Sequence, residues 1–366
     1  MKRWWVVGSV LAIAVALCMH WGVRFVTGAA YLERRLTEAV ASANGVNRVT
    51  IGSSHFSPLR RSFVATDIEY LPDTLLIAQK TKAGTPTRTR YTVTVSSLRV
   101  HGIRRWSLLR GNIVADSVTV DGLRLDVYLD RTAGPAPPAR SATLPHVSFQ
   151  SIDRSVRIGM IRVKGTEITY SEKARDGGRP GTIRFTDLWA TIYNAANDSV
   201  HVTPSTSCTI DIRTRIADAG RLDATFGYDL LSPRLSMTCR GSVARMNAES
   251  LNELLVDLVG IRITSGVVDS TWFDFAVKDD IADGTVEVLY HDFGFQVLDK
   301  VTMDRGLMAR FQTLIVNKMQ LKQANPADER TPATVATIHR ERLPETPLLK
   351  FLWESLREGL LLTIGL

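Results

Sequence analysis

Residues 118–130 read VTVDGLRLDVYLD, and they contain the pattern that decides the fold. After Gly122 every second residue is aliphatic and the residues between are polar; the aliphatic positions are Leu123, Leu125, Val127 and Leu129. Successive side chains of a β-strand point to opposite faces, so this spacing predicts one apolar and one polar face. The same alternation recurs as far as Val297, which predicts a mainly β fold.

Further apolar rows with a step of two residues extend the predicted apolar face. Its other candidate residues are Ile158, Met160, Ile210, Ile212, Leu222, Phe226, Leu235, Met237, Phe293, Phe295 and Val297. A phrase of the form apolar-x-Val-x-Gly also recurs at residues 98–102, 118–122 and 161–165. We interpret each glycine as a hairpin turn, which predicts about fifteen strands in one elongated, curled antiparallel sheet.

An uncharged run at residues 4–23 is long enough to cross a bilayer at about 1.5 Å per residue. Aromatic residues typical of membrane interfaces lie at its two ends, namely Trp4, Trp5, Trp21 and Phe25. We therefore predict a transmembrane anchor, with the bulk of the chain outside the cytoplasm. A cleaved signal peptide is the alternative, because residues 28–30 have the small side chains of a cleavage site.

Three parts follow from these patterns: an anchor at residues 1–27, a β-groove domain at 28–343 and an amphipathic helix at 344–366. Residues 134–145, GPAPPARSATLP, contain four prolines and are interpreted as an exposed loop inside the β domain. Helical spacing of apolar residues also predicts short helices at residues 31–44 and 247–260.

The C-terminal helix is expected to begin at a Thr346 cap followed by Pro347 in its first turn. One side of it is apolar: Leu349, Leu352, Trp353, Leu356, Leu360 and Ile364. Such a helix packs into a core, covers an apolar groove or lies in a membrane interface. The sequence leaves these three alternatives open.

No pattern of catalytic or metal-binding residues is visible. The seven histidines lack metal-ligand spacing, and HExxH, CxxC, P-loop and GxSxG motifs are absent from the sequence. His291 and Asp292 are adjacent, but consecutive strand residues are expected on opposite faces. We therefore predict a protein that is not an enzyme and that has no cofactor and no metal site.

Charge and cysteine positions narrow the interpretation further. The net charge of +8 is not concentrated in a dense Lys/Arg block, so nucleic acid is not an expected partner. Cys208 and Cys239 fall on the first and third strands of a predicted meander, roughly 9.5 Å apart. That separation is too large for a disulfide, so both are expected to be small buried residues.

The three predicted helices are too few to cover so many strands. The sheet must then fold on itself as a sandwich, or curl into a trough with an apolar inner wall. Acyl chains suit such a trough in a membrane-anchored protein, because burial recovers about 0.8 kcal/mol per CH₂ group. The predicted ligand is therefore the acyl portion of a phospholipid.

The order of these features resembles the AsmA-like family of bacterial envelope proteins, which includes TamB. The elements that carry the resemblance are YLERRLTEAV after the anchor, SLRVHGIRRWSLLRGNIVADSVTVDGLRLDVYLD, RIGMIRVKGTEITYSE, GTIRFTDLWATIYN, SLNELL, SGVVDSTWFDFAVKDDIADGTVEVLYHDF and FLWESLREGL. The resemblance implies a periplasmic β-groove on a single-pass inner-membrane anchor. Its implied role is phospholipid binding or transfer in support of outer-membrane lipid homeostasis.

A second class of function stays open beside lipid transfer. In it the protein is a structural or assembly factor, and a sheet edge pairs with outer-membrane or other envelope proteins by strand addition. The expected partners are thus phospholipid, the inner membrane and envelope proteins. About fifteen strands would give a groove of roughly 70 Å.

Overall fold

The computed structural model describes residues 47–57, 59–104, 106–107, 110–133, 142–174, 178–197, 207–298, 322–328 and 330–365. The predicted anchor, with Trp4, Trp5, Trp21 and Phe25, and the predicted helix at residues 31–44 lie outside these ranges. Within the described ranges, no helix combines the length and the apolar character that a membrane span requires.

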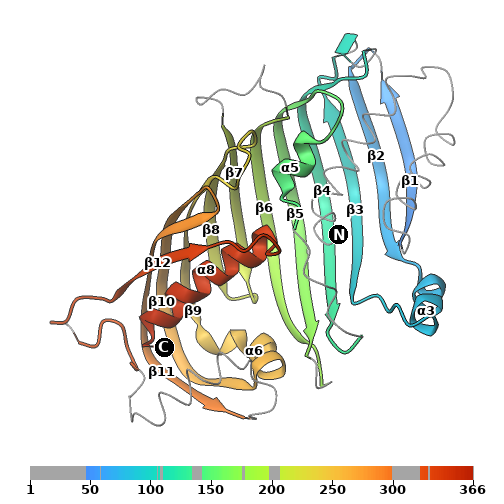
Figure 1. The fold of residues 1–366 in the computed structure, drawn as a ribbon. Coiled ribbons are helices and arrows are strands. Elements are labelled where there is room, and N and C mark those ends of the chain that lie inside the picture. Colours follow the sequence, from blue (N-terminus) through green and yellow to red (C-terminus); the bar gives the residue numbers. More distant parts are fainter. Residues whose placement is uncertain are drawn as a thin grey trace.

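Twelve strands form one open sheet whose spatial order follows the chain (Figure 1), so the prediction of a mainly β fold is confirmed. The strands are β1 (Asn47–Ser57), β2 (Ser62–Pro72), β3 (Thr89–His101), β4 (Ile113–Asp130), β5 (Val156–Lys173), β6 (Gly181–Ala196), β7 (Cys208–Ile216), β8 (Gly220–Tyr228), β9 (Met237–Asn247), β10 (Ile261–Lys278), β11 (Ile281–Val297) and β12 (Val335–Glu341). The helices are α3 (Thr74–Lys82), α5 (Pro145–Gln150), η2 (Ala248–Leu251), α6 (Asn252–Val259) and α8 (Leu348–Thr363).

One pair of strands departs from the predicted antiparallel sheet. β4 and β5 are parallel, whereas the other neighbours are antiparallel. Parallel neighbours need a crossover connection that returns the chain to the other end of the sheet. Residues 142–155 of the connection between β4 and β5 contain α5, so Pro145, the last residue of the predicted loop, begins a helix. Alternation of side chains does not encode strand direction, which is why the prediction was wrong here.

The number of strands is smaller than expected because most of the recurring glycines lie inside strands. Gly122 and Gly165 lie within β4 and β5, each with a positive φ, and Gly102 directly follows β3 with a φ of 73°. At Gly122 the inward positions step by three residues, from Val120 to Leu123, and then return to a step of two. The glycine thus marks an irregularity that keeps both halves of a long strand apolar on the same face.

These irregularities line up across neighbouring strands. The residue pairing places Gly52, Asp67, Ser96, Gly122 and Gly165 in one row across β1–β5. Asp67, Gly122 and Gly165 have left-handed backbone conformations. A row of aligned irregularities bends every strand at the same level and increases the local twist. We infer that the row contributes to the curvature of the sheet.

The sheet curls around α6, as contacts between distant strands demonstrate. α6 contacts β5 and β6 on one side and β10 on the other, although three strands separate β6 from β10. Arg184 on β6 holds Glu253 of this helix through three hydrogen bonds, the shortest at 2.8 Å. The predicted boundaries are confirmed here, because the Asn247 side chain caps η2 and Gly260 ends α6 in a left-handed conformation.

The C-terminal helix α8 packs against β11 and β12 on the inner side of the curl (Figure 1). A Cβ at Gly359 would lie 2.8 Å from Val286 atoms, so the glycine permits close packing of the helix on β11. The helix begins one residue later than predicted, with Pro347 as its N-cap and Thr346 buried before it. Of the three alternatives for this helix, the structure favours packing on the sheet.

A glycine pair tests the strand irregularity. Gly122 and Gly84 both have positive φ, but a Cβ would meet Ser96 Oγ at 2.4 Å only at Gly122, and nothing within 4 Å at Gly84. We expect Gly122→Ala to lower the free energy of unfolding by about 2–3 kcal/mol, and Gly84→Ala by about 1 kcal/mol. Chemical denaturation measures both values, and equal losses would contradict the contact at Ser96.

Candidate functional site

The inner face of the sheet carries two clusters of apolar side chains. The N-terminal cluster comes mainly from β1–β5 and includes Val93, Leu125 and Ile161. The C-terminal cluster comes mainly from β7–β12 and includes Phe275 of the sheet and Phe351 of α8. The half-buried Ile192 on β6 packs against both clusters. An apolar surface therefore continues along the inner face from β1 to β12, over about 50 Å for twelve strands.

Most of the predicted lining residues lie in these clusters. Four are buried: Leu125, Ile158, Leu235 and Met237. Ten are half-buried: Leu123, Leu129, Val127, Met160, Ile210, Ile212, Leu222, Phe226, Phe293 and Phe295. Of these, Leu129, Met160, Ile212 and Phe295 belong to neither cluster, and Val297 ends β11 opposite Ile261. The half-buried residues are the better candidates for contact with a ligand, because neighbouring side chains already cover the buried ones.

Strict alternation misplaced one residue and omitted others. Ile158 and Ile161 are buried in the N-terminal cluster, whereas Met160 is not part of it, because the inward positions of β5 step by three residues there. Phe273, Phe275 and Val277 were omitted although they alternate in WFDFAVK and are buried in the C-terminal cluster. The alternation was therefore sufficient to find these three residues. What it did not predict is where an irregularity shifts the inward positions by one residue, as at Met160.

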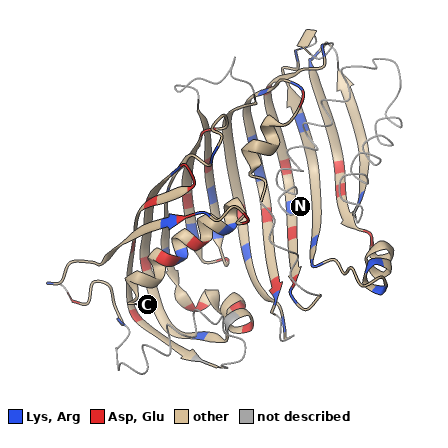
Figure 2. Cartoon of the chain, viewed as in Figure 1, with Lys and Arg blue, Asp and Glu red and all other residues tan. Residues whose placement is uncertain are grey.

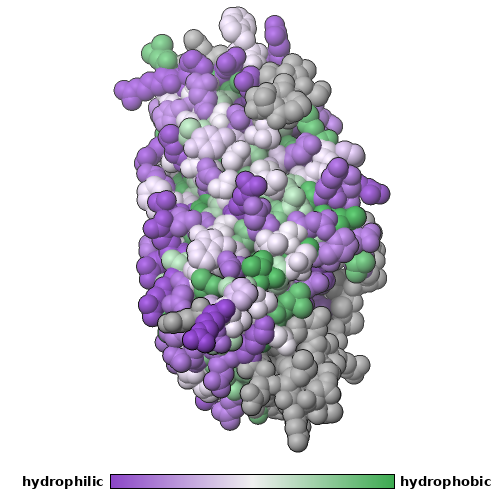
Figure 3. Space-filling view, turned by 90° about the vertical axis from the view of Figure 1, so that its left-hand side faces the viewer, coloured by the Kyte–Doolittle hydropathy of each residue, from purple (hydrophilic) through white to green (hydrophobic). Residues whose placement is uncertain are grey.

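The outer face is polar and of mixed charge. Neighbouring strands exchange ion pairs there, for example Arg213 with Asp223 at 2.8 Å and Arg240 with Asp274 at 2.9 Å. Figure 2 shows both signs of charge interspersed along the strands. Figure 3 shows hydrophilic residues over much of one side of the molecule, with apolar residues between them. Exposed ion pairs of this kind contribute little to stability.

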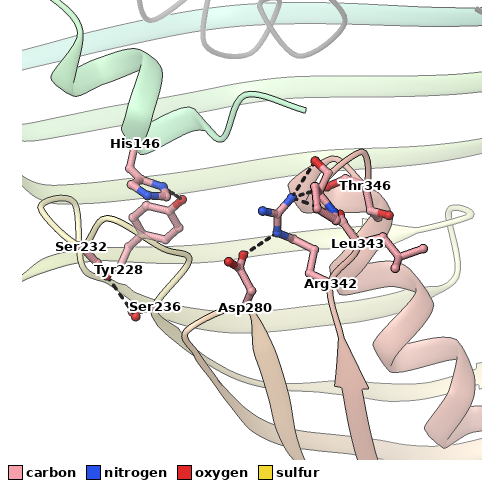
Figure 4. A network of polar contacts seen from close by, with 9 residues as sticks. His146, Tyr228, Ser232, Ser236, Asp280, Arg342, Leu343 and Thr346 are labelled. Atoms are coloured by element: carbon pink, nitrogen blue, oxygen red, sulfur yellow. Dashed lines mark hydrogen bonds and ion pairs between the residues drawn. The ribbon is translucent and has the colours of Figure 1, made fainter. Parts of the chain in front are cut away.

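A buried polar network lies where the crossover meets the C-terminal half of the sheet (Figure 4). His146 of α5 is 1% exposed, and its Nδ1 lies 2.8 Å from the Tyr228 hydroxyl oxygen at the end of β8. Burial lowers the pKa of His146 and raises that of Tyr228. The imidazole is therefore neutral at pH 7.

The second half of the network holds the turn before α8. Arg342 donates to Asp280 at 2.6 Å and to the Thr346 carbonyl oxygen at 2.9 Å. Its guanidinium also donates to the carbonyl oxygens of Leu343 and Pro344. The side chain of Arg342 is 8% exposed, so its charge depends on these partners rather than on water.

Cys208 and Cys239 are free and buried, on β7 and β9, with β8 between them. This arrangement confirms the predicted meander. Burial raises the pKa of each thiol to about 12, which keeps both protonated and unreactive.

The expected separation of His291 and Asp292 is wrong. Asp292 has a φ of 56°, and His291 Nε2 lies 3.9 Å from Asp292 Oδ2. His291 Nδ1 also lies 2.8 Å from Asp269 Oδ2 on β10. The left-handed residue interrupts the alternation and turns both side chains to one side. In the described part of the chain, no three His, Cys, Asp or Glu residues are placed to hold a metal ion.

Comparison with models of protein families gives no match for this chain, and comparison with curated proteins gives none either. The chain is therefore classified by its fold alone, as a protein with an open, curled, mixed β-sheet and an apolar inner face.

Proposed function

We propose that this protein binds or transfers phospholipids, with the acyl chains on the apolar inner face of the sheet. In this proposal it is an AsmA-like protein, held in the inner membrane by residues 1–27, and most of the chain lies in the periplasm. It has no catalytic role and supports the lipid balance of the outer membrane.

The observation that carries the proposal is the continuity of apolar side chains along the inner face. Ile192 packs on both clusters, so apolar side chains are continuous between them at this point of β6. A lipid on this surface loses contact with water along its acyl chains, while its headgroup stays at the polar rim.

Helix α8 adds a second apolar wall. Phe351, Ser355 and Gly359 are buried on the sheet side, whereas Leu349 and Trp353 are 55% and 52% exposed. Trp353 and Leu349 lie four residues apart and therefore share one face of the helix. This face is a candidate contact for an acyl chain beside the C-terminal cluster.

Mass spectrometry of lipids that co-purify with residues 31–366 tests the proposal. We expect phospholipid in about stoichiometric amounts, because a large apolar face in water is otherwise unfavourable. Protein that purifies folded, monomeric and free of lipid, and that binds no phospholipid from vesicles, would contradict it.

Strand addition is the second candidate function, and one observation favours it. β12 is the last strand of the described sheet, and its second edge has no neighbouring strand there. Val335, at the start of β12, is 51% exposed. An extended segment of an envelope protein fits such an edge through backbone hydrogen bonds. Replacing Thr337 by proline would remove backbone pairing without changing the apolar inner face, so it separates the two functions.

A further inference from the structure

The described end of the crossover, residues 142–155, lies across the path between the two apolar clusters. The strands run across the long axis of the sheet, and the crossover returns the chain from one end of β4 to the opposite end of β5. Its described part contributes Leu144 to the C-terminal cluster, while Phe149 and Ile152 pack on the N-terminal cluster. A ligand that moves along the inner face from β1 towards β12 must therefore pass this segment.

Two sets of bonds fix the crossover, and they differ in their partners. The Asn197 side chain donates to the carbonyl oxygens of Phe149, Ile152 and Arg154, which holds the end of the crossover to β6. At its start, Arg131 forms an ion pair with the buried Glu172 on β5. Asn197 and Glu172 belong to the strands next to the crossover or directly follow them, so these bonds do not restrain the contact of the crossover with the far half of the sheet.

Contact with the far half consists of the buried Leu144 and a small number of hydrogen bonds. His146 is hydrogen bonded to Tyr228, Gln150 donates to the Leu230 carbonyl oxygen, and the Ala142 amide donates to the Pro344 carbonyl oxygen at 2.7 Å. The buried Nε2 atom of His146 makes no hydrogen bond of normal geometry, and the nearby Ser232 backbone favours the protonated ring.

We propose that residues 142–150 form a gate that separates two apolar compartments, and that the gate opens when the bond between His146 and Tyr228 breaks. This inference rests on the proposed function for its role in lipid passage. The gate itself is a property of the chain and can be measured without lipid.

Acid is expected to open the gate. Burial lowers the pKa of His146 in the closed state, and release returns it towards its ordinary value of about 6.5. The closed state then binds fewer protons than the open state, so it is fully favoured above about pH 6.5 and weakens as the pH falls below that value. The Ser232 backbone, Asp229 and Asp280 favour the protonated imidazole, whereas burial and Arg342 oppose it.

Cys208 is a natural reporter of opening. It pairs directly with Tyr228, the partner of His146, whereas Cys239 lies two strands away on β9, opposite Phe226, although both thiols belong to the C-terminal cluster. Opening of the gate exposes the region of Cys208 and leaves Cys239 covered. Global unfolding exposes both thiols, so the second cysteine is an internal control.

The experiment measures maleimide labelling of both cysteines in the full chain, with Cys18→Ser as background and mass spectrometry as readout. Rates are normalised to the unfolded protein at the same pH. Tyr228→Phe and Gln150→Ala are each expected to raise the Cys208 rate about tenfold at pH 7.5 with Cys239 unchanged. Tyr193→Phe, which removes the hydroxyl of an exposed tyrosine, is expected to have no effect.

The pH arm uses the same readout. The wild-type Cys208 rate is expected to rise about tenfold from pH 7.5 to 5.5, and His146→Phe is expected to abolish this rise. The gate proposal would be wrong if the labelling rates of Cys208 and Cys239 rose equally. It would also be wrong if Cys208 stayed equally protected in both Tyr228→Phe and Gln150→Ala. Loss of lipid binding with an intact labelling response would instead refute only the proposed function.

Discussion

Replacing inward aliphatic or aromatic residues by aspartate is expected to reduce phospholipid co-purification more than tenfold. Val127→Asp and Phe295→Asp are the sharpest variants, because Val127 packs on the N-terminal cluster and Phe295 lies beside Phe293 of the C-terminal cluster, and both are only half-buried, so their loss disturbs the core less than that of the buried Leu125. A carboxylate placed against acyl chains loses its hydration and gains no partner, at a cost of more than about 2 kcal/mol. Mass spectrometry of bound lipid per mole of folded protein gives the measurement.

Matched controls lie next to these residues in the sequence. The Arg124 side chain is 71% exposed and 3.6 Å from Glu167, and Gln296 is exposed beside Phe295. Arg124→Ala and Gln296→Ala are expected to change stability by at most about 0.5 kcal/mol and to leave lipid content unchanged. Leu125→Asp serves as a third variant, in which lipid loss and destabilisation are expected together. Folded aspartate variants with a normal lipid content would exclude these rows from the ligand path and favour strand addition.

Arg342→Met is expected to lower the free energy of unfolding by about 3 kcal/mol. The substitution leaves Asp280, whose side chain is 19% exposed, without its cation, and it removes the donors to three carbonyl oxygens before α8. Removing one partner of a largely buried ion pair costs more than the pair contributes, because the remaining charge is left desolvated. Chemical denaturation measures the loss, and amide hydrogen exchange of residues 348–363 locates it.

Arg357→Met is the control for this effect. Arg357 is an exposed residue of α8, and its replacement is expected to change the free energy of unfolding by no more than about 0.5 kcal/mol. A loss of the same size in both variants, or unchanged exchange in α8 of Arg342→Met, would show that the turn does not depend on Arg342.

Local patterns were sufficient for the strands, several helix ends and the position of the cysteines. The alternation at residues 123–129 places Leu125 inward and Arg124 outward, as the structure does. The Asn247 cap and Gly260 mark the ends of the helical segment that covers the inner face. These features depend on residues within one or two turns or strands of each other, so the chain itself contains the information.

The number of strands, and which residues of each alternating row face inward, were harder to predict. The reason is that a glycine with positive φ occurs both in hairpin turns and inside irregular strands. Gly122 and Gly165 have the same sequence context as a turn, but their strands continue past them. The same ambiguity affected Asp292, whose left-handed backbone brings it beside His291. Only pairing with neighbouring strands decides between the two outcomes.

The alternation of apolar and polar residues is enough to predict a large amphipathic β-sheet, because it follows directly from strand geometry. The tertiary structure adds what this pattern does not contain: β4 and β5 are parallel, residues 142–155 lie on the inner face, and His146 meets Tyr228 from 82 residues away. The physical reason is that strand direction and long-range contacts depend on the packing of whole faces against each other. No local pattern of apolar and polar residues records which face a connecting segment will cover.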